Sequence, residues 1–361
     1  MSDRWRHPSY HVGFDKHVDT LSASQQAFAY LLDEWIRHPQ QMVVIVAGGP
    51  GSGKTYTVTS CLNRVSIPQL RMAPTARVAQ RIGGSTIHSA LRLKWSKGSV
   101  LFQLEKELEH ETNPDVCIEK SAVLLSEFNC YDAPDIVVID EIGISSFWFV
   151  HWIIQYFFGK ERPMLFIVMG DPNQLRPVKA SDNVFGIPLH FKIQRIDLHE
   201  SKRFTADYMP IIEQLRKYVD RNDETGCLTF ICNHFPIVEE ITSDILKKCT
   251  RALAYLNSTV ETYNNFYLKR LVKGEKIRLK REPFDNITYV DVKPGCFIFV
   301  TQNSSTVKNG TPLKFLRHVP DNNGDYIECK YVDNDSAVKV YRNRKGDFPI
   351  VVEIRKVIFP L

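Results

Sequence analysis

The sequence predicts an α/β protein built on a parallel sheet with helices on both faces. Three short and almost uniformly apolar runs indicate strands that are buried on both sides: Met42–Gly48, Asp135–Glu141 and Met164–Gly170. Longer stretches alternate with them, and their apolar residues recur at helical spacing. Each strand ends in glycine or acidic residues, and ligands of such sheets bind at these carboxyl ends. We therefore expect the functional residues there.

The composition is that of a globular protein rather than a disordered or fibrous one. The chain has 361 residues, 43% of them hydrophobic and 24% charged, enough for two or three domains. Its 46 Lys and Arg against 41 Asp and Glu leave a mildly basic balance, compatible with a polyanionic partner. The eight cysteines form no C-x-x-C pair, the N-terminus resembles no targeting peptide, and the longest apolar stretch, Phe147–Phe158, is too short for a membrane span. We expect an intracellular protein with reduced thiols and no membrane partner.

The order of elements changes near Leu198. Before the first strand, Ser22 or Ser24 caps an expected helix over Gln25–His38. The elements expected after Leu198 are a helix over Ala206–Val219, a short strand over Arg251–Asn257, a helix to about Val272, and short strands separated by turns over Lys293–Leu361. The last segment predicts a small antiparallel barrel or β-rich module.

A glycine-rich loop follows the first strand and precedes a helix-compatible run. It fits the pattern G-x-x-x-x-G-K-[ST]. In such loops the backbone N–H groups surround phosphate oxygens, the lysine reaches the β- and γ-phosphates, and the hydroxyl after it binds Mg²⁺. The residues assigned to the nucleotide are Gly48, Gly49, Pro50, Gly51, Ser52, Gly53, Lys54, Thr55 and Tyr56. We expect Thr55 to contact the metal.

Two acids, Asp140 and Glu141, end the second apolar strand. Side by side at the carboxyl end of a buried strand, one can hold Mg²⁺ and the other can activate water. We assign Asp140 to the metal and Glu141 to the general base. The alternative is a solvated strand end.

With these elements placed, the chain resembles the superfamily 1 (1B) DNA helicases of the Pif-like and RecD-like branch. The segments that look like its successive motifs are Ala73–Leu91, Val137–Ser146, Val168–Val178 and Leu198–Phe204. Leu21–Gln26 is similar to its adenine-reading element, Leu253–Asn265 to its second-lobe strand and helix, and Lys293–Pro312 to its inserted SH3-like module.

The resemblance implies a RecA-like parallel sheet flanked by helices, followed by a partial second RecA-like lobe. The expected domains are an ATP-binding lobe at 1–205 with a small insertion at about 92–132, the partial second lobe at 206–285, and an SH3-like β module with the start of a return into the second lobe at 286–361. Two terminal family motifs, a Thr-x-His-Lys-x-Gln-Gly type segment and a Ser-Arg segment, are absent from these residues. We expect a partner chain or a further segment to complete the second lobe.

The resemblance also implies roles for single residues. Gln25 reads adenine, Gln174 senses the γ-phosphate or its attacking water, and Arg203 reaches the same phosphate. The residues implied in DNA binding are Pro74, Thr75, Arg77, His88 and Asn257. Alternatives are that Gln174 caps a turn, that Arg203 forms a surface ion pair and that His88 is structural. The basic run Lys269–Glu282 can line a strand-binding groove, but a solvated face is favoured.

Three functions remain open. The first is an ATP- and Mg²⁺-dependent DNA helicase that moves on single-stranded DNA, 5′ to 3′ by resemblance, in replication, recombination or repair, in the nucleus or at a viral replication site. Its partner is a single strand or a junction of single- and double-stranded DNA. The second is a non-catalytic scaffold subunit that binds nucleotide and DNA. The third, a nucleotide kinase, explains Lys54 and Asp140 but not the segments around Gln174 and Arg203.

Overall fold

The structure, a computed structural model, divides into two compact units, Met1–His234 and Phe235–Leu361. It describes residues 7–93, 103–104, 107, 114–130, 134–145, 147–174, 185, 191–201, 203–205, 207–238, 242, 244–245, 257–270, 274–284, 287–301, 306–307, 311–320, 325–342 and 346–353. Among these residues, none of the helices combines the length and the apolar character that crossing a membrane requires.

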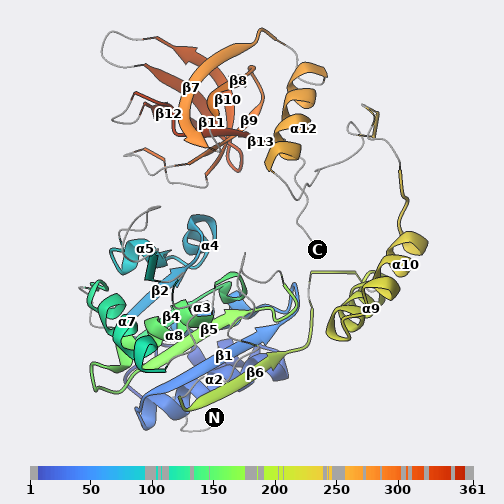
Figure 1. Ribbon diagram of the computed structural model, residues 1–361. Helices are drawn as coiled ribbons and strands as arrows, with labels where there is room; N and C mark the ends of the chain where they lie inside the picture. The colour runs from blue at the N-terminus through green and yellow to red at the C-terminus, as the bar shows by residue number, and fades with distance from the viewer. Residues whose placement is uncertain are drawn as a thin grey trace. The chain divides into compact units, whose positions relative to one another are not determined.

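A six-stranded sheet forms the centre of the first unit (Figure 1). Its strands are β1 (Met42–Gly48), β2 (Gln69–Ala73), β3 (Ser85–Thr86), β4 (Ile136–Ile139), β5 (Leu165–Gly170) and β6 (Ile193–Leu198). The order is β3-β2-β4-β5-β1-β6, and every neighbouring pair is parallel. The three strands expected from apolar runs are thus confirmed as β1, β4 and β5. In register, Ala47 lies beside Gly170 and Gly48 beside Leu198, so these strands end at one edge.

Helices cover both faces of this sheet (Figure 1). The helices of this unit are α1 (Phe14–Asp19), α2 (Ala23–Arg37), α3 (Lys54–Leu62), α4 (Ala76–Arg81), α5 (Ile87–Ala90), α7 (Pro114–Ser126), the 3₁₀ turn η2 (Ile142–Ile144), α8 (Phe147–Phe158), α9 (Met209–Asp220) and α10 (Glu224–His234). The last two pack against each other rather than covering a face of the sheet. Alternate residues of β1 point to opposite faces, so Val43 packs in one core with Trp152 and Val44 in another with Phe28. The buried helix expected at Phe147–Phe158 is confirmed as α8.

The second unit is mostly antiparallel β structure. The sequence predicts short strands over Lys293–Leu361, and the structure adds two earlier strands that were not expected, Ile277–Phe284 and Ile287–Val292. The elements of this unit are α12 (Asn257–Arg270), β7 (Ile277–Phe284), β8 (Ile287–Val292), β9 (Phe297–Val300), β10 (Pro312–Val319), β11 (Tyr326–Tyr331), β12 (Ala337–Tyr341) and β13 (Ile350–Glu353). Five strands form a sheet in the order β12-β11-β10-β9-β13, and β7 pairs with β8. A hydrophobic core that includes Leu279, Phe315 and Phe348 lies within this unit.

Two expected elements differ in the structure. The strand expected over Arg251–Asn257 lies mostly outside the described residues, and its last residue, Asn257, begins α12 instead of ending a strand. The helix expected from Ala206 begins at Met209, with Pro210 in its first turn. Proline has no N–H to donate and fits a helix only there, so it marks the start of α9.

Candidate functional site

The glycine loop joins β1 to α3 in a conformation that requires glycine. Gly51 and Gly53 have φ angles of +81° and +83°, which side-chain-bearing residues rarely adopt. A Cβ on Gly51 would overlap the Cβ of Arg203, and one on Gly53 would lie 2.6 Å from Nε2 of Gln25. The loop is therefore shaped by its own backbone and by two segments that pack closely against it.

Lys54, the first residue of α3, folds back over this loop. Its Nζ donates hydrogen bonds to the carbonyl oxygens of Gly48 at 2.7 Å and Gly49 at 3.1 Å. Burial lowers the pKa of Lys54, while the nearby carboxylates of Asp171 and Asp140 act in the opposite direction. A partly desolvated ammonium beside the backbone amides of the loop is suited to an anionic ligand.

Thr55 and Asp140 meet beside the lysine. The Thr55 hydroxyl donates to Oδ2 of Asp140 at 2.7 Å, and the backbone N–H of Glu141 donates to Oδ1 at 2.8 Å. The side chain of Asp140 is 1% exposed. A hydroxyl and a carboxylate are hard oxygen ligands, and Mg²⁺ in nucleotide sites usually takes one or two carboxylates together with phosphate oxygens. The donor set therefore fits Mg²⁺.

Arg81, the last residue of α4, faces both acids and was not foreseen from the sequence. Its Nη2 lies 3.2 Å from Oε1 of Glu141 and 3.5 Å from Oδ2 of Asp140. Glu141 precedes η2 as its N-cap residue and has a left-handed backbone conformation, with a φ of +54°. Arg81 lies 59 residues from Asp140 along the chain, and nothing in its local pattern indicates this contact.

A second ion pair, also missed from the sequence, lies between β5 and α9. Nη1 of Arg216 donates to both oxygens of Asp171, at 3.0 and 2.9 Å, and the Asp171 side chain is 3% exposed. One helical turn further, Asp220 accepts a 2.6 Å hydrogen bond from the side chain of Asn173. Asp171 follows an apolar strand as Asp140 does, so the same rule applied to the third strand would have found it.

The two residues expected near the γ-phosphate lie in different settings. Gln174 is exposed, in the turn after β5, where its backbone N–H donates to the carbonyl of Asp171 at 3.1 Å. Arg203 is exposed beside Gly51, and Ser201 next to it donates to the carbonyl of Pro50 at 2.9 Å. The segment of Arg203 therefore lies against the glycine loop, and the turn of Gln174 contains Asp171, whose carboxylate influences the pKa of Lys54.

A pocket of about 180 Å³ lies between the glycine loop, the end of β6 and α9. Ser52 and Arg216 are among its lining residues. The Ser52 hydroxyl is buried and has no hydrogen-bond partner among the residues that the structure describes. Arg216 also approaches the loop, since a Cβ on Gly49 would lie 3.1 Å from its Nη1.

Gln25 joins α2 to the glycine loop. Its Nε2 donates to the carbonyl of Ser52 at 3.2 Å, and its Oε1 accepts from the backbone N–H of Ser22 at 3.1 Å. The hydroxyls of Ser22 and Ser24 donate to Oε2 of Glu200. The Gln25 side chain is thus placed against the loop, next to the expected nucleotide. Tyr56, in contrast, is exposed on α3.

The residues expected to bind DNA fall into three groups. Pro74 and Thr75 follow the carboxyl end of β2, and Thr75 precedes α4, on which Arg77 is exposed. His88 on α5 is partly buried and stacks on Phe149, with ring centroids 5.8 Å apart, and burial lowers its pKa. Asn257 belongs to the second unit. The structure thus brings Pro74, Thr75 and Arg77 together on one segment.

Comparisons with known proteins give the family and the fold. A family model described as an AAA domain matches residues 20–232. The uncharacterized protein R530 of Acanthamoeba polyphaga mimivirus is 23% identical over 293 residues, which cover 71% of this chain and 58% of that protein. The chain therefore spans less than two thirds of the length of this relative.

Two solved structures share the fold over most of the chain. One is a Pif1 helicase from Bacteroides in complex with ADP-AlF3 and ssDNA, with a TM-score of 0.59 and 17% identity over 92% of this chain and 82% of that one. The other is the Pif1 helicase from Candida albicans, with a TM-score of 0.58 and 18% identity over 92% of this chain and 84% of that one. At these identities the likeness is one of fold.

Proposed function

Because the chain belongs to the AAA-domain family and shares the fold of the Pif1 helicases, we propose that it is an ATP-dependent DNA helicase. It would translocate on single-stranded DNA, 5′ to 3′ by family resemblance, in replication, recombination or repair. The observation that carries the proposal is the cluster of Lys54, Thr55, Asp140 and Glu141 at the carboxyl ends of β1 and β4. A loop that grips phosphate beside two acids is the arrangement of a nucleotide hydrolase.

The residues of this cluster divide the work of hydrolysis. Lys54 exchanges its two loop carbonyls for phosphate oxygens, and the backbone amides of the loop bind the rest of the phosphate chain. Thr55 and Asp140 would hold Mg²⁺, which neutralises charge on the β- and γ-phosphates. Glu141 then accepts the proton of the attacking water.

Other residues would sense the terminal phosphate and the base. Arg203 and Gln174 are proposed to contact the γ-phosphate, with Arg203 already beside the loop at Gly51. Gln25 is proposed to read adenine from its position against the loop. Asp171, held by Arg216, fixes the turn that carries Gln174.

The strand is proposed to contact Pro74, Thr75, Arg77, His88 and Asn257. Support comes from the Bacteroides Pif1 structure, which contains ssDNA, and from a structure that describes Pif1 helicases unwinding forked dsDNA. The proposal includes lobe boundaries at residues 205 and 285. It also includes a further segment or a partner chain that completes the second lobe. A location at a viral replication site or in the nucleus is part of the proposal, and the relative R530 comes from a virus.

A second candidate is a nucleotide- and DNA-binding subunit that does not hydrolyse ATP. The contact of Arg81 with Glu141 favours it, because the guanidinium occupies the carboxylate oxygen Oε1 that an attacking water would need. Phosphate transfer to an acceptor would indicate the kinase alternative.

The test compares the full chain with Lys54→Ala. We expect ATP turnover that single-stranded DNA stimulates, and a fall of about 10²- to 10³-fold in the variant, because the lysine stabilises charge on the transferring phosphate. Salt-dependent strand binding should persist, since Lys54 does not contact DNA in this proposal. A Glu141→Gln control should bind ADP normally and lose turnover.

Turnover that is equal with and without DNA contradicts the helicase proposal. Tight nucleotide and DNA binding without turnover supports the scaffold instead.

A further inference from the structure

Helix α4 connects the expected DNA contacts to the catalytic acids. It begins directly after Pro74 and Thr75 at the end of β2, and its last residue, Arg81, reaches Asp140 and Glu141. The helix has six residues, so only about 9 Å of helix separate its two ends. A change at its first turn is therefore close to the acids.

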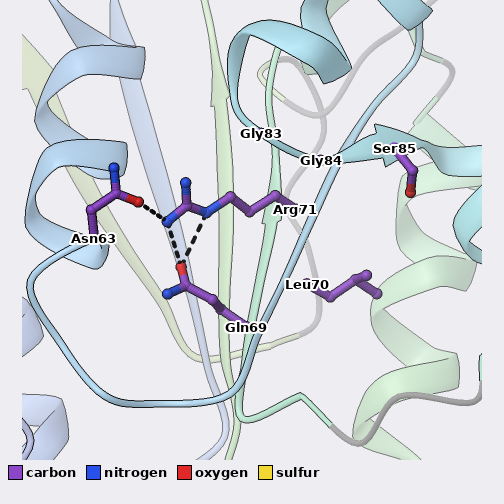
Figure 2. A pocket seen from close by; sticks show the side chains of 7 residues that line it. All are labelled: Asn63, Gln69, Leu70, Arg71, Gly83, Gly84 and Ser85. Carbon is purple, nitrogen blue, oxygen red and sulfur yellow. Dashed lines mark hydrogen bonds between the residues drawn. The ribbon is translucent and has the colours of Figure 1, made fainter. Parts of the chain in front are cut away.

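The C-terminal end of α4 is fixed to the sheet by a hydrogen bond from Arg71. Arg71 on β2 donates to the carbonyl of Ile82, the residue after α4, at 3.1 Å. It also donates to side-chain oxygens of Asn63 at 2.5 Å and Gln69 at 2.9 Å, across the pocket that Figure 2 shows. All three acceptors are uncharged. Arg71 thus braces the backbone next to Arg81, whose own side chain is half exposed.

Arg77 and Arg81 lie on the same side of α4. They are four residues apart, a spacing at which Cβ atoms on a helix are about 5–6 Å apart. Two guanidinium groups at this spacing repel each other unless anions lie near them. Arg81 has its anions in Asp140 and Glu141, whereas Arg77 is exposed. A phosphate bound by Arg77 would come within reach of Arg81 as well.

We propose that Arg81 couples the two sites by exchanging partners: it pairs with Asp140 and Glu141 in the absence of DNA and with a backbone phosphate of the strand when DNA binds α4. While Arg81 pairs with the acids, its positive charge weakens Mg²⁺ binding at Asp140, and its guanidinium occupies Glu141. Pairing with phosphate releases both acids. The inference rests on the proposed function, and it makes Arg81 a positioning residue rather than a catalytic one.

The first test needs no turnover. The full chain is titrated with Mg²⁺ in the presence of fluorescently labelled ADP, and the half-saturating Mg²⁺ concentration is compared with that of Arg81→Gln. We expect the half-saturating Mg²⁺ concentration to fall about two- to fivefold in Arg81→Gln, because a half-exposed ion pair changes affinity by about this factor. Arg81→Lys, which keeps the charge, should stay closer to the parent chain. An unchanged Mg²⁺ requirement in Arg81→Gln overturns the proposal.

The second test measures ATP turnover with and without single-stranded DNA. Arg81→Gln should raise the DNA-free rate about two- to fivefold and leave the DNA-saturated rate unchanged, so the stimulation ratio falls. The matched control is Arg37→Gln, because Arg37 also extends from a helix to a buried carboxylate, that of Asp33 at 3.0 Å. Both of its rates should equal those of the parent. Equal losses of both rates in Arg81→Gln would indicate structural damage and overturn the proposal.

The results separate this inference from the proposed function. If the parent chain shows no DNA-stimulated turnover, the proposed function fails, and the Mg²⁺ titration alone decides whether Arg81 competes for the acids. If the parent is stimulated and Arg81→Gln behaves like Arg37→Gln in both tests, the helicase proposal stands and the coupling role of Arg81 is wrong.

Discussion

Charged residues around Lys54 are arranged as two acid–arginine pairs. Asp140 and Asp171 are both buried, each directly follows a central strand, and each pairs with an arginine from a different helix, Arg81 or Arg216. A buried carboxylate without a partner is costly, so both arginines stabilise the site. They also limit how much negative charge faces Lys54, which leaves its ammonium available to an anionic ligand.

His88 makes folding stability depend on pH. Burial lowers the pKa of His88 in the folded chain, so the unfolded chain binds the proton more readily. The stability that neutral His88 contributes is complete at pH values above its pKa in the unfolded chain, about 6.5. This stability declines as the pH falls below about 6.5 toward the lower pKa of the folded chain. His88→Phe keeps a ring against Phe149 and cannot be protonated. We therefore expect a smaller drop in melting temperature between about pH 7.5 and 5.5 in this variant.

His17 provides the internal comparison for that experiment. Burial also lowers the pKa of His17, with a smaller effect from Arg64, and its ring contacts the Ser60 hydroxyl at 2.9 Å. Part of the acid sensitivity should therefore remain in His88→Phe. An identical pH dependence in parent and variant would show that His88 is not buried enough to resist protonation.

Among the elements, the glycine loop combines left-handed backbone conformations with close packing. Gly51 has a positive φ and is pressed against Ser201 and Arg203, whereas Gly13, at the start of α1, has a φ of +85° and no heavy atom within 4 Å of an added Cβ. The two positions therefore separate the conformational cost of a side chain from the cost of overlap.

We expect Gly51→Ala and Gly13→Ala to differ in nucleotide binding. Each variant should lose about 1–2 kcal/mol of folding free energy, because each places an alanine in a left-handed backbone conformation. In Gly51→Ala the overlap also displaces the loop, so affinity for ADP should fall about tenfold or more. Thermal unfolding and an ADP titration measure the two effects. Equal ADP affinities in the two variants would mean that the loop adapts to the added methyl group.

At the scale of the whole molecule, the hydrophobic cores stay within the units. The two large cores on either face of the first sheet contain residues up to Leu198, and the core of the second unit runs from Leu268 to Ile350. The described residues therefore form no core shared by the units. Each unit has the apolar interior that independent folding needs.

We expect two thermal transitions in calorimetry of the full chain. A chain of residues 1–234 should reproduce one of them, because it retains the complete parallel sheet and both of its cores. ADP should raise the transition of that unit and leave the other in place, since the nucleotide residues lie in the first unit. A single cooperative transition for the full chain would contradict this division.

The sequence by itself determined the parallel sheet and the family resemblance, which the AAA-domain match and the fold confirm, and it predicted the phosphate loop. These features are local: an apolar run makes β1, and glycines at fixed spacing make the turn after it. Tertiary structure alone decided which cations meet the acids. Arg81 and Arg216 lie 59 and 45 residues from Asp140 and Asp171, and only the packing of α4 and α9 brings each pair together. No spacing along the chain encodes such a contact, because it depends on where whole helices settle on the sheet.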